Sequence, residues 1–182
     1  MSTKEERREL VAKLVAQREA LFQEVDNMPA HRLTTAWKEG DRTPMGMLHH
    51  VISAERMYRD DWTRRARDED EPDLRPQEWG GGGGGAPLFE EANQMSKDEL
   101  VQRLKEERMK TLQFIAETSD AEFDRKGRNL PFGDLTVNQL LKSLYRHDQM
   151  HIDEMAGRES RFVPLARLNV EPSIEGIALS RP

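Results

Sequence analysis

Two histidines, His147 and His151, stand four positions apart in the stretch LYRHDQMHIDEM of residues 144–155. In an α-helix, residues four apart are neighbours on one face with Cβ atoms about 6 Å apart, so both imidazoles can reach one metal ion. The pattern His-x-x-x-His alone is a weak motif. Here, however, helical periodicity puts both rings on the apolar side that carries Leu140 and Leu144. The stretch therefore predicts either a metal site or two core histidines bonded to carbonyls or carboxylates.

A metal site needs a third ligand, and the other histidines are His31, His49 and His50. The 182 residues contain no cysteine, which excludes thiolate ligands, disulfides and a cysteine nucleophile. His31 falls in the polar segment PAHRLT, where we expect it to be solvated. His49 and His50 are adjacent on a predicted helix, so only one can face inward. His50 shares its side with Tyr58, but periodicity leaves the choice between the two open.

Two predicted helices lie in the N-terminal half of the chain. The first spans about residues 4–26 and repeats apolar residues at helical period. The second opens at Thr43-Pro44, a capping residue followed by proline at the first helical position. It fades into a mixed-charge run over residues 64–73. Six consecutive glycines, Gly80–Gly85, then predict a flexible glycine-rich loop over about residues 74–90.

Two further helices follow this loop. The third starts at Ser96, because SKDEL reads as a capping box closed by Glu99. The fourth runs from near Asp134 to Gly157, a plausible glycine cap. The last segment, residues 158–182, contains three prolines and no apolar repeat, which predicts an extended tail packed on the bundle or on a partner. We find no β-hairpin signal, and we expect an all-α fold with a four-helix bundle over residues 1–157.

Charged side chains interrupt the apolar stripes of these helices. Glu55 and Asp148 lie near the middle of their stripes, where an unpaired charge is costly. Together with Glu154 they are candidates to accept the second N–H of histidine ligands. Arg18 and Arg108 interrupt the other two stripes. The arginines either belong to a buried ion-pair network that sets helix register, or Arg108 binds a carboxylate of a substrate near the metal.

Residues 48–55 (LHHVISAE) and 147–155 (HDQMHIDEM) together resemble two elements of the DinB-like (YfiT-like) superfamily of four-helix proteins. These elements read Leu-x-His-φ-x-x-x-Glu and His-x-x-x-His. The resemblance extends to the order, spacing and caps of the four helices, about residues 5–157. It implies a divalent metal held by His50, His147 and His151. Where the family often has glutamine three residues after the last histidine, this chain has Glu154, which makes the site more acidic.

The resemblance also implies a class of chemistry. Members with assigned activities include small-thiol-dependent S-transferases and isomerases, and proteins described as metal-dependent hydrolases. Three neutral imidazoles leave a divalent ion its full charge, which lowers the pKa of water or of a small thiol at an open position. Zn or Ni is favoured, although Fe and Mn are not distinguished. The alternative is a non-catalytic protein that binds metal or a small ligand, or a structural helical bundle.

Composition excludes several other classes. Charged residues make up 34% and hydrophobic residues 36% of the chain, and the net charge is −6 at pH 7. This balance argues against a nucleic-acid partner, which needs a clustered basic surface. No run approaches the roughly 20 apolar residues that span a bilayer, and MSTKEERREL lacks the apolar region of a signal peptide. We expect a cytoplasmic protein that acts on a small molecule, with a homodimer left open.

Overall fold

The computed structural model of the chain describes residues 4–37, 41–74, 94–130, 133–160, 162–164 and 178–180. Its four long helices are α1 (Lys4–Asp26), α3 (Pro44–Arg56), α6 (Lys97–Glu117) and α7 (Val137–Met155). The expected all-α four-helix bundle is therefore confirmed. Apart from its first residue, the predicted glycine-rich loop lies outside the described residues, as does most of the predicted tail. None of the described helices is both long and apolar enough to cross a membrane.

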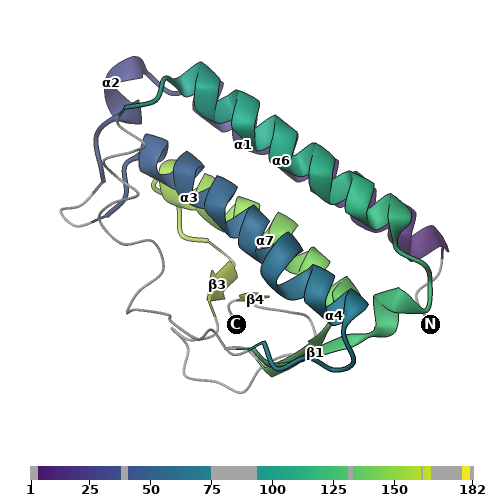
Figure 1. The fold of residues 1–182 in the computed structure, drawn as a ribbon. Coiled ribbons are helices and arrows are strands. Elements are labelled where there is room, and N and C mark those ends of the chain that lie inside the picture. Colours follow the sequence, from purple (N-terminus) through teal and green to yellow (C-terminus); the bar gives the residue numbers. More distant parts are fainter. Residues whose placement is uncertain are drawn as a thin grey trace.

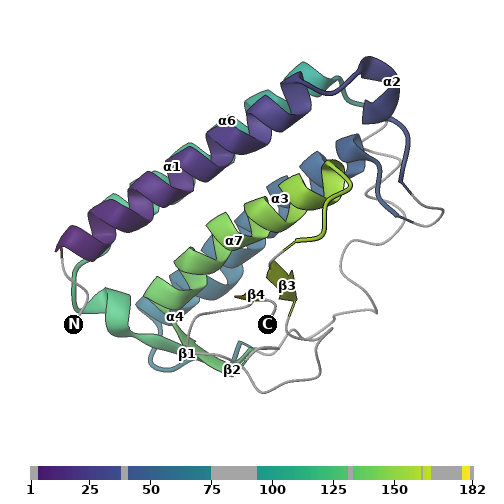
Figure 2. The same ribbon diagram turned by 180° about the vertical axis from the view of Figure 1, so that it is seen from behind.

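The helices are arranged as two pairs. α1 and α6 lie together on one side of α3 and α7 (Figures 1 and 2). α1 packs against α7, α6 packs against α3, and α3 and α7 contact each other. α1 and α7 run in one direction and α3 and α6 run in the other, as the chain colours of Figure 1 show. The two helices that carry the candidate histidines, α3 and α7, are thus antiparallel neighbours.

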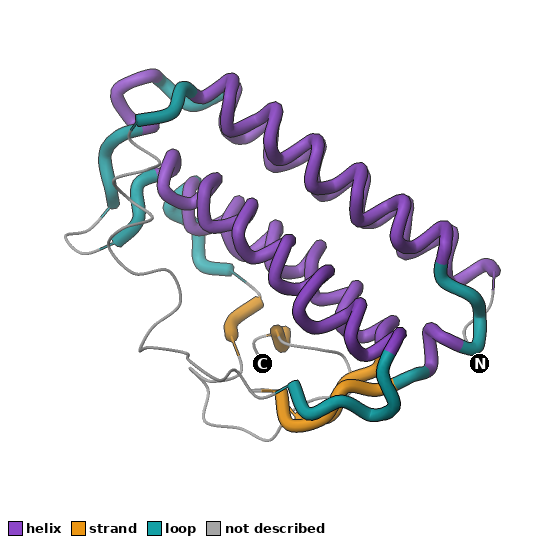
Figure 3. The backbone as a smooth tube through the Cα atoms, in the orientation of Figure 1, coloured by secondary structure: helices purple, strands orange, loops and turns teal. Residues whose placement is uncertain are grey.

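Short elements close both ends of the bundle (Figure 3). The helix α2 (Ala30–Leu33) lies at one end, and α4 (Arg64–Asp68) lies with the strands β1 (Lys126–Leu130) and β2 (Gly133–Thr136) at the other. A 3-10 turn, η2 (Glu122–Asp124), precedes β1. The strands β3 (Phe162–Pro164) and β4 (Ala178–Ser180) pair antiparallel and contact α7 on the side away from α1 and α6.

The predicted caps of the second and third helices are confirmed. The Thr43 hydroxyl accepts a hydrogen bond from the Gly46 amide, and Pro44 takes the first helical position. Ser96 and Glu99 form the reciprocal capping box ahead of α6. Both signals depend on residues within four positions of each other, so they can be read from the sequence alone.

The expectation for the start of the fourth helix is wrong by three residues. Gly133–Thr136 pairs with β1 as a β-hairpin, so α7 begins at Val137 and is capped by Thr136. The expected absence of a hairpin is likewise wrong. KGRNL has no alternating apolar pattern, and its pairing depends on tertiary contacts that bury Leu130 and Leu135 in the core. A single-sequence pattern does not contain that information.

At the other end of α7, Gly157 is a glycine cap, as predicted. Its φ is +66°, which side-chain-bearing residues rarely adopt, and the Arg158 amide donates to the Asp153 carbonyl. A Cβ atom on Gly157 would meet the Trp37 ring at 3.1 Å. The Trp37 indole N–H also donates to the Met155 carbonyl at 2.9 Å. Trp37 therefore ties the segment before α3 to the end of α7.

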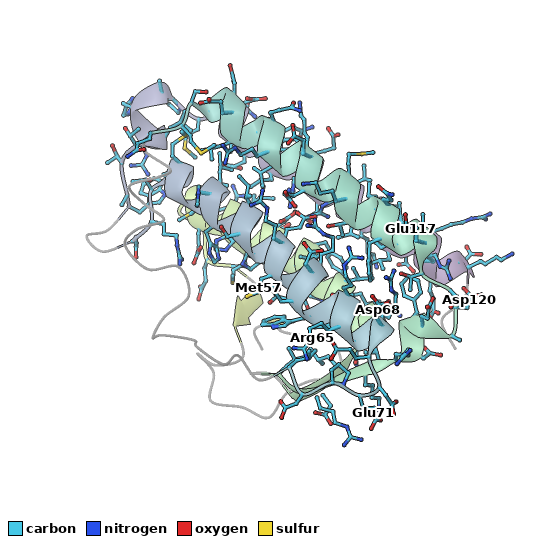
Figure 4. All side chains as sticks on the ribbon, in the orientation of Figure 1. Met57, Arg65, Asp68, Glu71, Glu117 and Asp120 are labelled. Atoms are coloured by element: carbon cyan, nitrogen blue, oxygen red, sulfur yellow. The ribbon has the colours of Figure 1, made fainter. Side chains whose placement is uncertain are left out.

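Each long helix carries a buried charged residue between two apolar stretches. On α1, Arg18 lies between the fully buried Leu14 and Leu21. The other three helices contribute Glu55, Arg108 and Asp148 at the same level. This polar layer, defined by these four charged residues, separates one apolar cluster around Phe114 from a second around Leu48. Side chains fill the space between the helix pairs (Figure 4), and all four residues of the layer are buried.

Candidate metal centre

Three histidines from two helices converge beside the polar layer. His50 comes from α3, and His147 and His151 come from α7. Nε2 of His147 lies 3.2 Å from Nε2 of His50 and 3.0 Å from Nε2 of His151. One ligand atom from each ring falls within 4.8 Å of the others. The contact between α3 and α7 therefore adds His50 to the pair of histidines that the His-x-x-x-His spacing places on one face of α7.

The donor set fits a divalent ion. An ion bound about 2.0–2.1 Å from three nitrogens holds them roughly 3.0–3.4 Å apart, depending on coordination geometry. The two Nε2 separations that involve His147, 3.0 and 3.2 Å, fall in that range. Imidazole nitrogens suit Zn, Ni, Fe and Cu ions. The residues present are thus compatible with the metal that the family resemblance implies.

Two of the three rings, His50 and His147, are kept in the neutral form that binds metal. Burial, together with the charges of His151, Arg42 and His49, lowers the pKa of His50 to about 2. Burial, followed by the charges of His151 and His50, also holds the pKa of His147 well below its usual range. Neutral imidazoles expose the nitrogen lone pair that a metal requires. No proton therefore needs to leave these two rings at neutral pH.

A carboxylate sets the tautomer of the third ring. His151 is 2% exposed, and its Nδ1 lies 2.7 Å from Oε2 of the partly exposed Glu154. A carboxylate is an acceptor, so the proton of His151 belongs on Nδ1 and the lone pair on Nε2. That lone pair faces His147. Glu154 therefore contacts His151 as the sequence suggested, and its role beside a metal ligand stays a prediction.

Glu55 and Asp148 have different partners. Oε1 of Glu55 lies 2.9 Å from Nε of Arg108, and its Oε2 lies 2.6 Å from Nη2 of Arg18. Oδ2 of Asp148 lies 2.9 Å from Nη2 of Arg108 and 3.1 Å from Nε of Arg18. Two guanidinium groups and two carboxylates therefore alternate in one neutral cluster, with side chains no more than 5% exposed.

Backbone groups complete this cluster. Arg18 donates to the Leu104 carbonyl and Arg108 donates to the Leu14 carbonyl, so each arginine also bridges α1 and α6. Burial and the charge of Arg18 lower the pKa of Arg108. Burial also acts to lower the pKa of Arg18, but the negative charges of Asp148 and Glu55 have the larger effect and raise it. The ion-pair alternative for the two arginines is the arrangement observed. A contact between Arg108 and a substrate stays a prediction. For such a contact, Arg108 would have to break some of its ion pairs with Glu55 and Asp148.

A separate hollow is lined by residues of the π-helical segment η1 (Met57–Thr63), α4 and α6. It has a volume of about 340 Å³ and is open to solvent between η1 and α6. Its cations are engaged: Arg59 pairs with Asp60 and Glu107, and Lys110 pairs with Glu107. This hollow contains none of the three histidines and contributes nothing to the candidate metal centre.

The sequence matches the DinB superfamily over residues 6–155. The chain belongs to the DinB superfamily. The matched range begins in α1 and ends at the last residue of α7, so it includes the four long helices and the three histidines. No protein of curated function matches the sequence significantly.

Solved structures share this DinB fold. One is YfiT from Bacillus subtilis, described as a probable metal-dependent hydrolase with an unusual four-helix bundle topology. The two are 19% identical, with a TM-score of 0.66 over 86% of this chain and 87% of YfiT. Another is the mycothiol-dependent maleylpyruvate isomerase, at 11% identity and a TM-score of 0.65 over 85% of this chain. The chain spans 63% of that isomerase, and a mutant form of the enzyme gives the same values.

The DinB fold brings together some predicted residues and leaves others out. His50 joins the histidine cluster, whereas the buried His49 points elsewhere on α3 and His31 is exposed. Sequence reasoning did not single out Arg42, whose charge lowers the pKa of both His50 and His147. Arg42 precedes the cap of α3 in a segment without periodicity, so no sequence signal marks it. Tyr58, noted only for its place on the helix face, lies with its ring centroid 6.3 Å from that of His147.

Proposed function

We propose that this chain is a metal-dependent enzyme in which His50, His147 and His151 hold a divalent ion, with Zn or Ni favoured. The reaction is hydrolysis, or transfer to a small thiol, of a small-molecule substrate. A divalent ion on three neutral histidines supplies a Lewis acid that activates water or a thiol near neutral pH.

The contacts of His147 carry the proposal. An imidazole nitrogen has one position in the ring plane for either a proton or a lone pair, so it makes one good hydrogen bond. Nε2 of His147 nevertheless has two nitrogen neighbours, at 3.0 and 3.2 Å. Hydrogen bonds among the rings cannot satisfy all three nitrogens at once. A cation shared by three lone pairs does.

The surroundings of the cluster favour an active centre over a purely structural one. Glu154 holds the proton of His151 on Nδ1 and leaves Nε2 to face the cluster. His147 and His151 are buried, which excludes water from one side, whereas His50 is only partly buried and leaves the other side accessible. We expect the bundle to stay folded without an ion in the cluster, because two large apolar clusters lie on either side of the polar layer. The accessible side is where a substrate would enter.

The solved relatives support both halves of the reaction class. YfiT is described as a probable metal-dependent hydrolase, and the isomerase is described as mycothiol-dependent. At 19% and 11% identity neither description transfers directly to this chain. Activity assays must therefore decide whether the nucleophile is water or a small thiol. We therefore propose screening the metal-loaded protein with ester and amide substrates and, separately, with electrophiles in the presence of small thiols.

Metal content tests the proposal directly. Protein purified without a histidine tag should hold close to one divalent ion per chain. We expect His147→Ala, His151→Ala and His50→Ala each to lose it, because two ligands make a poor site. His49→Ala is the matched control, since adjacent helical side chains point about 100° apart. Undiminished metal in His151→Ala would refute the site. Metal retained by His50→Ala but lost by His49→Ala would show that the wrong α3 residue has been assigned.

A further inference from the structure

The two helices that carry the candidate ligands also carry the two carboxylates of the polar layer. On α7, Asp148 follows His147 directly and precedes His151 by three residues. On α3, Glu55 follows His50 by five residues, about one and a half helical turns. A rotation or a slide of either helix therefore moves a carboxylate and a candidate ligand together.

Arg18 of α1 joins these two carboxylates. Its Nε and Nη2 each lie 3.1 Å from an oxygen of Asp148, and the same Nη2 lies 2.6 Å from Oε2 of Glu55. Its Nη1 donates to the Leu104 carbonyl, so all three nitrogens are engaged. A guanidinium is a rigid planar fork, and bonds in this geometry fix how their acceptors lie relative to each other. Arg18 thereby fixes α3 against α7, and Arg108 bonds the same two carboxylates from α6.

The direction of Asp148 decides where the histidines of α7 point. Its carboxylate is turned toward the arginines of α1 and α6. At about 100° per residue, His147 and His151 are then turned away from Asp148 by about 100° and 60°, to the same side of the helix. On that side both rings meet His50 of α3.

The apolar packing near the histidines holds this register less firmly. The apolar cluster around Leu48 contains the residues that follow His50 and His151 in the chain, together with three buried methionines, Met45, Met47 and Met155. Methionine is unbranched and adapts to shifts of its neighbours, and apolar contacts have no preferred direction.

The polar layer resists such shifts. Glu55 and Asp148 are each 1% exposed, so a slide that broke their bonds would leave a buried charge without a partner. A metal site needs its ligands held to within about 0.5 Å. The directional bonds of the polar layer supply that precision.

We propose that Arg18 is a positioning residue for the candidate metal centre. Through Glu55 and Asp148 it holds α3 and α7 at the register in which the three histidines meet. This inference rests on the proposed function, since it assumes that the histidines bind an ion. It gives the buried ion pairs a role in metal affinity that is separate from their role in stability. The charge of Arg18 by itself acts in the opposite direction, because a cation close to the ligands repels a metal ion.

The test measures Co²⁺ affinity by competition with a chromophoric chelator, and the visible absorption of the bound Co²⁺, which reports its ligands. Arg18→Lys keeps the charge but loses the fork, and Arg18→Met loses both. Leu10→Ala is the matched control, because it leaves a cavity at a side chain of α1 that is 2% exposed and about two turns from Arg18. Circular dichroism verifies that each variant is folded at the temperature of the measurement.

We expect both Arg18 variants to bind Co²⁺ about tenfold or more weakly and with a changed absorption spectrum, because His50 no longer meets the other two rings. Leu10→Ala should bind within about twofold of the unaltered protein, although it is less stable. Arg18→Lys decides the question if Arg18→Met does not fold.

Two results overturn the inference while the metal site stands. One is unchanged affinity in Arg18→Lys or tighter binding in Arg18→Met, which would leave the charge of Arg18 as its whole effect on the site. The other is an equal loss of affinity in Leu10→Ala, which would attribute the effect to lower stability. Failure of the unaltered protein to bind Co²⁺ refutes the proposed function itself.

Discussion

Replacing Arg108 with methionine removes one of the two cations of the polar layer. The guanidinium bonds Glu55, Asp148 and the Leu14 carbonyl, all in a buried setting. Methionine fills similar space but leaves Arg18 alone against two buried carboxylates. Breaking a buried ion pair from one side costs about 3–5 kcal/mol, because a charge remains uncompensated. For a chain of this size, each kcal/mol lowers Tm by about 2–4 °C, so we expect a drop of roughly 6–20 °C.

Urea denaturation followed by circular dichroism measures this loss, with metal and with chelator. Lys110→Met is the matched control, two positions along α6. Its ammonium also pairs with a buried carboxylate, but its side chain is 56% exposed and Glu107 keeps Arg56 and Arg59. An exposed pair of this kind is worth about 0–1 kcal/mol. A loss in Arg108→Met no larger than the loss in Lys110→Met would refute the reasoning.

A double variant tests the charge argument separately from lost packing. Glu55→Gln in the Arg108→Met background removes the uncompensated charge and leaves Arg18 with Asp148 alone. The two changes should therefore cost less together than the sum of their separate costs, with a coupling of about 0.5–3 kcal/mol. Strict additivity would mean that shape and lost hydrogen bonds, and not charge balance, decide the stability of the layer.

Three further predictions follow from other contacts. Glu154→Gln should weaken metal binding about 10–100-fold, measured by competition with a chromophoric chelator, because His151 loses the carboxylate that orients it; unchanged affinity would contradict that role. Chelation should leave the helical circular dichroism spectrum intact and lower stability only by the binding linkage, about 4 kcal/mol at a thousandfold excess over Kd; loss of most of the helix would show a structural site. Arg59 lowers the pKa of Asp60, and Lys110, Arg56 and Arg59 together outweigh burial and lower the pKa of Glu107. On acidification the unfolded chain therefore binds these protons before the folded chain does. The free energy of unfolding should fall as pH drops below the ordinary pKa values of 3.8 and 4.5. If the melting temperature of Arg59→Met falls with pH as steeply as that of the unaltered protein, the ion pairs of Arg59 are not the cause.

Local patterns predicted much of the fold. The first helix spans the expected residues 4–26, and Thr43, Ser96 and Gly157 act as the caps that their residue types indicate. Helix periodicity and capping involve residues within one or two turns, so their energetics are present in the sequence itself. The pairing of His147 with His151 belongs to the same class, because a helix places residues four apart on one face whatever surrounds it.

Contacts between distant segments decided the rest. The choice of His50 over His49 depends on how α3 is rotated against α7, which packing alone sets. The β1–β2 hairpin forms because Leu130 and Leu135 find a core, not because KGRNL favours a strand. Sequence indicated that Arg18 and Arg108 would be buried, but two arginines and two carboxylates allow several pairings. The observed network exists because all four long helices bring their charged residues to one level, and the cost of burying an unpaired charge leaves few other arrangements.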